Sequence, residues 1–221
     1  MLSIQNISKS FAGRGLVLDK LNLKINAGDS VAITGPSGSG KTTLMNIIGL
    51  LDSPDSGEIL FMDKSVQDLD NKEAALYRNR NIGFVFQEHL LLPHLTVIEN
   101  IILPLMASRI NDTEYREKYE YGLSLMEKTA IADLRDKFPH QISGGEAQRA
   151  TVVRALINKP SILLADEPTG SLDHKNADIL GEMLRDLNRE LGIALLLATH
   201  SPDLAKKMNK HLILTDGKLV K

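Results

Sequence analysis

The sequence predicts an α/β fold with three parts: a parallel-sheet core, an N-terminal antiparallel β subdomain, and an α-helical subdomain inserted into the core. Three observations predict this fold. A glycine-rich loop joins a short apolar strand to a helix within residues 30–50, and strands alternate with helices again from residue 161. Within residues 18–25, Leu21, Leu23 and Ile25 alternate with polar side chains, which is typical of a half-buried antiparallel strand. Between these regions, residues 88–157 have helical patterns.

The composition indicates an ordinary globular protein whose 221 residues are enough for one sizeable core. The formal net charge of −2 argues against a generally basic surface, so we expect no nucleic-acid partner. The absence of cysteine excludes disulfides, thiolate catalysis and cysteine-based zinc sites. The N-terminus has no secretory signal pattern, and no apolar run is long enough to span a membrane. We therefore expect a cytoplasmic protein.

The first sixty residues combine an antiparallel ribbon with a strand–loop–helix unit of the parallel type. Strands are predicted at residues 2–8, 18–25, 30–34 and 58–62. A helix is predicted at residues 43–50, because Leu44, Ile47 and Ile48 fall on one face at helical spacing.

The loop between the third strand and this helix matches the phosphate-binding pattern G-x-x-x-x-G-K-[ST]. The stretch consists of Gly35, Pro36, Ser37, Gly38, Ser39, Gly40, Lys41, Thr42 and Thr43. Glycines let backbone N–H groups converge on an anion, and the helix N-terminus adds its dipole. Lys41 supplies a positive charge for the outer phosphates, and the Thr42 hydroxyl can bind Mg²⁺. A glycine-rich turn without a ligand is the alternative, but the flanking strand and helix favour nucleotide binding.

Residues 88–157 are interpreted as a helical insert between two strands of the core. It follows a helix and a strand predicted at residues 72–80 and 82–86. Within it, Thr96 and Glu99 form a capping box that opens one helix, and Asp112 or Thr113 can cap a second.

From residue 161 onwards the strands and helices alternate as in an open parallel sheet, whose ligand site lies at the carboxyl ends of the strands. Strands are predicted at residues 161–165, 193–199 and 211–214, and helices at residues 176–191 and 202–208. Gly192 ends the first of these helices, and residues 215–218 predict a hairpin turn.

Polar side chains follow three of the apolar strands: Gln87 the first, Asp166 and Glu167 the second, and His200 the third. Taken singly, each polar residue can be explained as a loop residue at the point where the chain leaves the sheet. Together with a phosphate loop at a fourth strand end, they predict a shared site. Asp166 can hold Mg²⁺, and Glu167 can polarise or deprotonate the attacking water. Gln87 can approach Mg²⁺ or water, and His200 can donate a hydrogen bond to the outer phosphate.

A second glycine-containing stretch consists of Ser143, Gly144, Gly145 and Glu146. Ser143 and Glu146 form a capping box before a helix predicted over residues 147–156. Two glycines inside a cap cost backbone entropy, but they let an anion approach the helix N-terminus closely. Both interpretations can hold at once: a capped helix that presents Ser143 and N–H groups to a phosphate.

In this order, the motifs resemble those of the ATP-binding subunits of ABC transporters, over essentially the full length of the chain. The matching segments are residues 35–43 (Walker A), Gln87 (Q-loop), residues 143–146 (signature motif), residues 162–167 (Walker B and catalytic glutamate), residues 171–173 (D-loop) and His200 (switch histidine). Phe11 lies where the family stacks an aromatic ring on adenine. The resemblance implies a P-loop NTPase core at residues 1–87 and 158–221 and a helical subdomain at residues 88–157, within one domain.

The signature motif departs from the common form Leu-Ser-Gly-Gly-Gln, because this chain has Ile142 and Glu146. A glutamate in the last position resembles the subgroup of macrolide-export and lipoprotein-release ATPases, as do residues 49–52 and 84–87.

The resemblance implies ATP and Mg²⁺ as cofactors and ATP hydrolysis as the activity. It also implies a head-to-tail homodimer, in which Ser143, Gly144 and Gly145 of one copy close over ATP bound at Lys41 and Thr42 of the other. A separate membrane permease would be the partner, which places the protein on the cytoplasmic face of the cell membrane. The alternatives are a non-transport ATPase of the same superfamily, acting in DNA repair, chromosome maintenance or translation, and an unrelated phosphate-loop kinase or GTPase. No coiled-coil insert or second nucleotide domain supports the first, and the Ser143 motif argues against the second.

Overall fold

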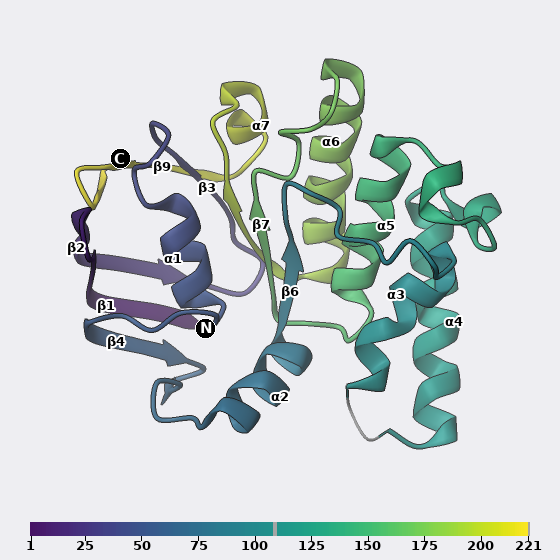
Figure 1. The fold of residues 1–221 in the computed structure, drawn as a ribbon, viewed down its shortest axis with the longest axis horizontal. Helices are drawn as coiled ribbons and strands as arrows, with labels where there is room; N and C mark the ends of the chain where they lie inside the picture. The colour runs from purple at the N-terminus through teal and green to yellow at the C-terminus, as the bar shows by residue number, and fades with distance from the viewer. Residues whose placement is uncertain (108–109, 221) are drawn as a thin grey trace.

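The computed structural model of the protein describes residues 1–107 and 110–220. An antiparallel sheet lies at one end of the molecule, parallel strands occupy its centre, and a group of helices lies at the other end (Figure 1). These helices are α3 (Val97–Met106), α4 (Asp112–Lys128) and α5 (Gly144–Leu156). The predicted fold class is confirmed: an α/β fold with an antiparallel β subdomain and a parallel core.

The antiparallel sheet has four strands in the order β2-β1-β4-β5. They are β1 (Leu2–Phe11), β2 (Gly15–Ile25), β4 (Ser56–Phe61) and β5 (Lys64–Ser65). In β2 the predicted alternation is observed, since Leu21, Leu23 and Ile25 are buried while the residues between them are exposed. Both strands of the first hairpin are longer than predicted, and Phe11 pairs with Gly15 across a tight turn.

The central sheet has six strands in the order β10-β9-β3-β8-β7-β6. They are β3 (Ser30–Thr34), β6 (Ile82–Val85), β7 (Ile162–Asp166), β8 (Ala194–Ala198), β9 (Lys210–Thr215) and β10 (Lys218–Val220). Every neighbouring pair is parallel except β9 and β10. All five residues of β8 are buried, as expected for a parallel strand covered on both faces. The carboxyl ends of β3, β6, β7 and β8 therefore meet at one edge, where the phosphate loop begins.

Four further helices pack beside the two sheets. They are α1 (Lys41–Ile48), α2 (Asn71–Asn81), α6 (His174–Leu191) and α7 (Pro202–Lys206). In α6, Leu180, Leu184 and Leu187 form the buried stripe, and the helix ends at Gly192 with a φ of 64°. The Cβ of any other residue would cost free energy in this left-handed conformation, which explains the predicted end of the helix.

The helices between β6 and β7 are those that the sequence indicates, with two corrections. Helix α5 begins at Gly144 and not at residue 147, because the residues that follow the Ser143 cap are already helical. Thr96 and Glu99 form the predicted capping box of α3, with the Thr96 amide donating to Glu99 Oε2 over 2.7 Å. Helix α4 is capped by Asn111, not by Asp112 or Thr113, because Asn111 Oδ1 accepts from the Glu114 amide over 2.9 Å. All three are good capping residues, so composition does not distinguish them. The proposed boundaries of this subdomain, residues 88 and 157, stay a prediction.

Within the described ranges, none of the helices is both long enough and apolar enough to cross a bilayer.

Candidate functional site

A cavity of about 340 Å³ lies at the sheet edge where the strands end. Its wall is formed by Arg14, Ser37, Gly38, Gly40, Lys41, Thr42, Thr43, Gln87, Glu167 and His200. Four separate segments that the sequence singles out thus meet around one space: the phosphate loop with the start of α1, and the residues after β6, β7 and β8. Only Arg14 comes from a segment that the sequence did not mark.

The backbone of the phosphate loop requires glycine at both ends. Gly35 has a φ of 154°, and a Cβ there would lie 2.3 Å from the carbonyl oxygen of Leu214 in β9. Gly40 has a φ of 105°, and its Cβ would lie 2.9 Å from Val17 Cγ1 in β2. The loop is therefore held between the two sheets, and a larger side chain at either position would displace it.

The N-terminus of α1 has the properties of an anion site. Gly40 provides no side-chain cap, and the first turn contains no acidic residue, so no side chain competes for the free N–H groups. The Lys41 side chain is only 8% exposed, and its Nζ donates to the carbonyl oxygens of Gly35 (2.9 Å) and Pro36 (3.2 Å). A buried ammonium and uncapped amides together favour a phosphate chain at this point.

Glu167 and His200 lie in contact in the wall of the cavity. Glu167 Oε2 accepts from the His200 backbone amide over 3.1 Å and lies 2.8 Å from His200 Nδ1. The other oxygen, Oε1, lies 3.9 Å from Lys41 Nζ. Glu167 has a φ of 48°, a left-handed conformation that is unfavourable for a non-glycine residue and is common at functional sites. The carboxylate is thus held between a histidine and the phosphate-loop lysine, where it can orient a water molecule.

Asp166, the last residue of β7, has the chemistry of a metal ligand. Burial raises the pKa of its carboxyl group, while a hydrogen bond with the Thr42 hydroxyl acts in the opposite direction. Its Oδ1 atom is buried and has no hydrogen-bond partner. A buried carboxylate oxygen without a partner costs free energy unless a cation or a water molecule satisfies it. Asp166 and Thr42 together therefore fit Mg²⁺, which prefers hard oxygen ligands.

The other predicted residues on this side of the molecule lie inside or beside the cavity wall. Gln87 is part of the wall and packs against Gly170, where a Cβ would lie 3.1 Å from the Gln87 amide carbon. Phe11 lies at the end of β1, is 39% exposed, and has Lys9 Nζ 5.3 Å from its ring centroid. Because Phe11 is not part of the wall, its role as an adenine platform stays a prediction.

Ser143, Gly144, Gly145 and Glu146 are not brought to this cavity. Ser143 caps α5, and the predicted capping box is present: Glu146 Oε2 accepts from the Ser143 amide and hydroxyl, each over 2.7 Å. These hydrogen bonds lower the pKa of Glu146. Ser143 and Gly144 are exposed, and a Cβ on Gly144 would meet nothing closer than 4.0 Å. The start of α5 is open to solvent, so an approaching molecule can contact it.

Arg14 is the residue of the wall that the sequence did not indicate. It lies in the turn between β1 and β2, outside every motif, and its position depends on how the hairpin packs against the phosphate loop. In the sequence, Arg14 is marked only by the glycines on either side of it, Gly13 and Gly15. A cation between two glycines does not indicate a binding site unless the tertiary structure is known.

A parallel sheet with a phosphate loop after β3 and carboxylates after β7, two strands away, defines a phosphate-loop nucleotide hydrolase. A family model described as ABC transporter matches residues 18–170. The chain belongs to the ABC transporter family and is an ATP-binding subunit that hydrolyses ATP. The family predicted from the motifs is thereby confirmed.

Relatives of known name match the chain along its whole length. It is 41% identical to the lipoprotein-releasing system ATP-binding protein LolD of Myxococcus xanthus, covering 99% of this chain and 98% of that protein. It is 43% identical to LolD 1 of Rhodopirellula baltica, covering 100% and 96%. A solved structure, the dimeric post-hydrolysis state of the ATP-binding cassette MJ0796 bound to ADP and Pi, has 37% identity and a TM-score of 0.86, covering 100% and 97%. The predicted resemblance to lipoprotein-release ATPases is confirmed.

Proposed function

We propose that this chain powers the export or extraction of a membrane substrate by hydrolysing ATP as a head-to-tail homodimer beneath a separate membrane permease. The proposal rests on one observation: the predicted ATP-site residues lie at two separate places on the chain. Lys41, Glu167 and His200 surround one cavity, whereas Ser143 and Gly144 are exposed elsewhere. A second copy can bring its Ser143 to the first copy's phosphate loop, and the dimeric state of the solved MJ0796 cassette supports this arrangement.

Within the cavity, we assign each residue one task. The phosphate loop and Lys41 bind the phosphates, and Glu167 accepts a proton from the attacking water or orients it. His200 fixes the Glu167 carboxylate through two contacts, its backbone amide and Nδ1. Gln87 lines the same wall and can contact the water or the metal.

Asp166 and Thr42 would hold Mg²⁺, with Gln87 nearby. The unpartnered Oδ1 atom of Asp166 supports this assignment. When bound, the ion neutralises charge that develops on the phosphate oxygens.

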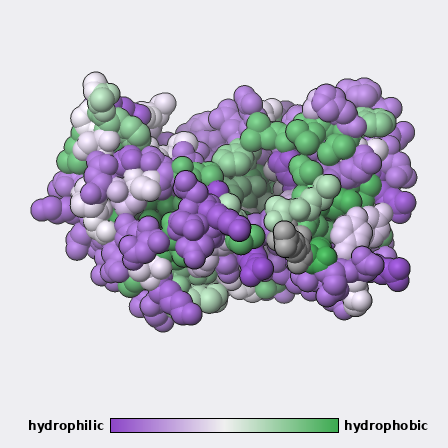
Figure 2. All heavy atoms as spheres, turned by 60° about the horizontal axis from the view of Figure 1, so that its bottom comes forward, coloured by the Kyte–Doolittle hydropathy of each residue, from purple (hydrophilic) through white to green (hydrophobic). Residues whose placement is uncertain are grey.

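We propose that the permease binds in a groove at the boundary between the parallel core and the helical subdomain. The groove lies between α2, β6, α3 and α5 and has a volume of about 390 Å³. Figure 2 shows a hollow with apolar residues around it on this face of the molecule. Phe84, Phe86, Pro104 and Ala155 are among its lining residues. The groove begins beside Gln87, which follows β6, so a segment bound there can influence the ATP site.

The names of the full-length relatives support a lipoprotein-release type of role. We expect a protein with such a role to act at the cytoplasmic face of the membrane. Co-purification tests it: a tagged chain should recover an integral membrane protein from detergent-solubilised membranes, and Phe86→Asp should abolish recovery while ATPase activity in solution persists. Recovery of only soluble proteins would instead support the non-transport ATPase.

The dimer is tested without any partner. If two chains build each site, the ATPase rate per molecule should rise with protein concentration. A rate per molecule that does not change with protein concentration, together with a monomer in size-exclusion chromatography with ATP, would contradict the shared site.

A further inference from the structure

We propose that Arg14 binds the phosphate chain of the nucleotide, reaching it from the turn between β1 and β2. The proposal rests on nucleotide binding at the phosphate loop, and it adds a cation that lies outside the sequence motifs. Three features of the structure support it: the turn fixes the backbone of Arg14, the turn packs on the loop, and no carboxylate of the described residues pairs with the guanidinium.

The turn fixes the backbone of Arg14 in place. Strand β1 ends at Phe11 and β2 begins at Gly15, so only three residues connect them. The Arg14 amide donates to the Phe11 carbonyl oxygen over 3.1 Å. Gly13 and Gly15 have φ values of 78° and 75°, which let the chain reverse on both sides of Arg14.

The start of β2 then places this turn beside the phosphate loop. A Cβ on Gly40 would lie 2.9 Å from Val17 and 3.1 Å from Leu18, so these two residues of β2 press directly on the loop backbone. The Arg14 side chain extends over the loop, where its Nη2 atom donates to the Gly38 carbonyl oxygen. Arg14 is consequently part of the cavity wall, together with Lys41 and Thr43.

Among the described residues, no carboxylate neutralises the charge of Arg14, whose guanidinium bonds only to the Gly38 carbonyl oxygen. Across residues 1–107 and 110–220, no carboxylate lies within ion-pair distance of its guanidinium. The neighbouring cation of the same hairpin, Lys9, is by contrast paired with Asp52 over 2.8 Å. A guanidinium offers five N–H donors, of which the contact with Gly38 uses one, and its planar fork matches a phosphate group. An unpaired cation in the wall of an anion cavity points to the nucleotide phosphates as its ligand.

The affinity for ADP, measured by calorimetry without turnover, tests this proposal. Arg14→Ala should raise the Kd for ADP by about tenfold or more, since a charge-assisted hydrogen bond to phosphate is lost. Arg14→Lys should recover part of the affinity. Arg14→Gln keeps a donor for the Gly38 carbonyl but no charge, and it should bind as weakly as Arg14→Ala.

Two controls keep the result interpretable. Lys24→Ala removes one positive charge from the exposed face of β2, away from the cavity, and should leave the Kd unchanged. Lys41→Ala should abolish measurable ADP binding; if it does not, the assignment of the phosphate loop itself fails. If Lys41→Ala behaves as expected while Arg14→Ala binds ADP like the wild type, only the Arg14 proposal is overturned. Full affinity in Arg14→Gln would also overturn it, because the side chain would then serve only to hold Gly38.

Discussion

Two helices of this protein begin with glycine-containing motifs, and their N-termini are built in opposite ways. Helix α1 begins after Gly40 without a side-chain cap, inside a cavity that contains Lys41. Helix α5 begins after Ser143, which together with Glu146 satisfies its own amides, and it faces solvent. The first N-terminus is incomplete without an anion, whereas the second is stable in the free chain.

This difference indicates a division of labour within one ATP site. In the site that we propose, the α1 end supplies the free amides, the buried cation and the carboxylates that bind and hydrolyse the nucleotide. The α5 end is a preformed lid surface that needs no ligand to keep its shape, and it can be presented to another copy at little conformational cost. Substitutions at either end, or in the connection between them, should therefore have separable effects on hydrolysis, assembly and stability.

Removing the base at the α1 end should have the largest effect. Glu167→Gln keeps the shape of the side chain but cannot accept the proton of water, so turnover should fall by about 10³-fold. Because both ends still bind ATP, the variant should accumulate as a dimer in ATP. Phosphate release and size-exclusion chromatography measure the two outcomes. Unchanged turnover with only monomer in ATP would show that Glu167 does not have this role.

Asp166→Asn tests the proposed Mg²⁺ ligand at the α1 end. It should lower the activity but raise the stability of the nucleotide-free protein. Hydrolysis should fall by about 100-fold, since a carboxylate ligand for Mg²⁺ is lost. The nucleotide-free protein should become more stable at pH 7, because burial raises the pKa of Asp166 and the ionised form is disfavoured in the fold.

The stability gain of Asp166→Asn should depend on pH in a defined direction. It is full above the raised pKa of the folded state, and it disappears as the pH falls below the ordinary value of 3.8, where the carboxyl group is protonated in both states. Thermal unfolding at several pH values measures it. A loss of stability at pH 7 would contradict the assigned burial cost.

At the α5 end, Glu146→Gln should change assembly more than folding. The amide still accepts from Ser143, so the cap persists, but a negative charge is removed from a surface that approaches phosphate. We expect the dimer in ATP to tighten by about two- to fivefold at low salt, measured by analytical ultracentrifugation. The variant should also lose the small stabilisation that the ionised Glu146 gives the folded state. This stabilisation is fully present above the ordinary glutamate pKa of 4.5 and is lost as the pH falls through the lowered pKa of Glu146. A weaker dimer in ATP would mean that the charge itself assists closure.

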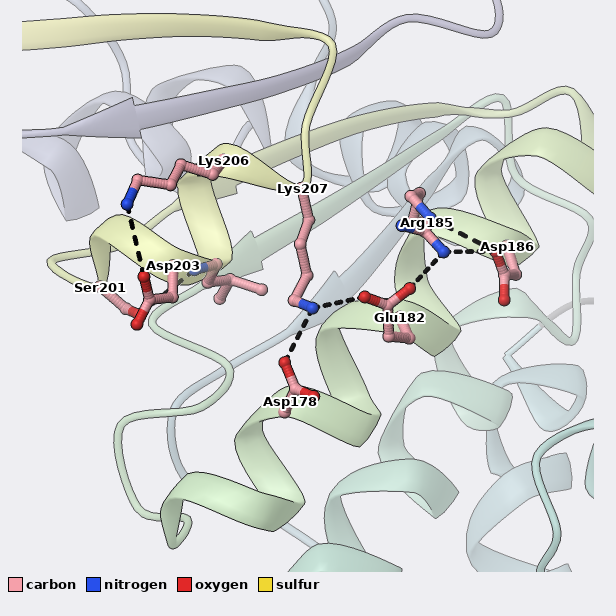
Figure 3. A network of polar contacts seen from close by, with 9 residues as sticks. Asp178, Glu182, Arg185, Asp186, Ser201, Asp203, Lys206 and Lys207 are labelled. Atoms are coloured by element: carbon pink, nitrogen blue, oxygen red, sulfur yellow. Dashed lines mark hydrogen bonds and ion pairs between the residues drawn. The ribbon is translucent and has the colours of Figure 1, made fainter.

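The connection between the two ends passes through α6. At its start, Asn176 contacts α5, since a Cβ on Gly145 would lie 2.7 Å from Asn176 Oδ1. Further along, Lys207, which follows α7, reaches across to Asp178 (2.8 Å) and Glu182 of α6 (Figure 3). Helix α7 itself begins directly after His200 and Ser201. The Lys207 contacts therefore hold the segment of His200 against the helix that touches the α5 end.

Lys207→Ala should loosen this connection with the smallest effect of the series. A partly exposed ion-pair network contributes about 1 kcal/mol, or a shift of about 2–4 °C in Tm for a chain of this size. Lys206→Ala is the matched control, because the one ion pair of Lys206 within the described part of the chain is with Asp203 of its own helix, over 3.6 Å (Figure 3). Equal shifts in both variants would contradict a specific role of Lys207.

The pH dependence of the Lys207 contribution follows from its partners. Hydrogen bonds with Asp178 and Glu182 raise the pKa of Lys207, and Lys207 lowers the pKa of Asp178. The contribution is therefore present above the ordinary Asp178 pKa of 3.8 and below the ordinary Lys207 pKa of 10.5. It is lost as the pH falls through the lowered pKa or rises through the raised one.

What could be predicted from the sequence depends on how local the controlling interaction is. The phosphate loop and the ends of β7 and β8 are set by glycine spacing and apolar runs, so Lys41, Glu167 and His200 were placed correctly at one edge. Arg14 was missed, because its position depends on Val17 and Leu18 packing against Gly40, a contact between segments more than twenty residues apart. The separation of Ser143 from the cavity was expected only from the family resemblance, since no local pattern reveals which helix ends face each other.

The claim that two copies share each site is tested most directly by mixing two inactive variants. Lys41→Ala impairs the α1 end and Ser143→Arg impairs the α5 end, so each variant alone should hydrolyse ATP hardly at all. In an equal mixture, half of the dimers are mixed and each has one intact site, so the rate should recover to about a quarter of the wild-type rate. Two controls are needed: each variant must remain folded, and each must still form dimers when mixed with the wild type. If the mixture of the two variants then stays as inactive as each variant alone, the two ends do not combine across a homodimer.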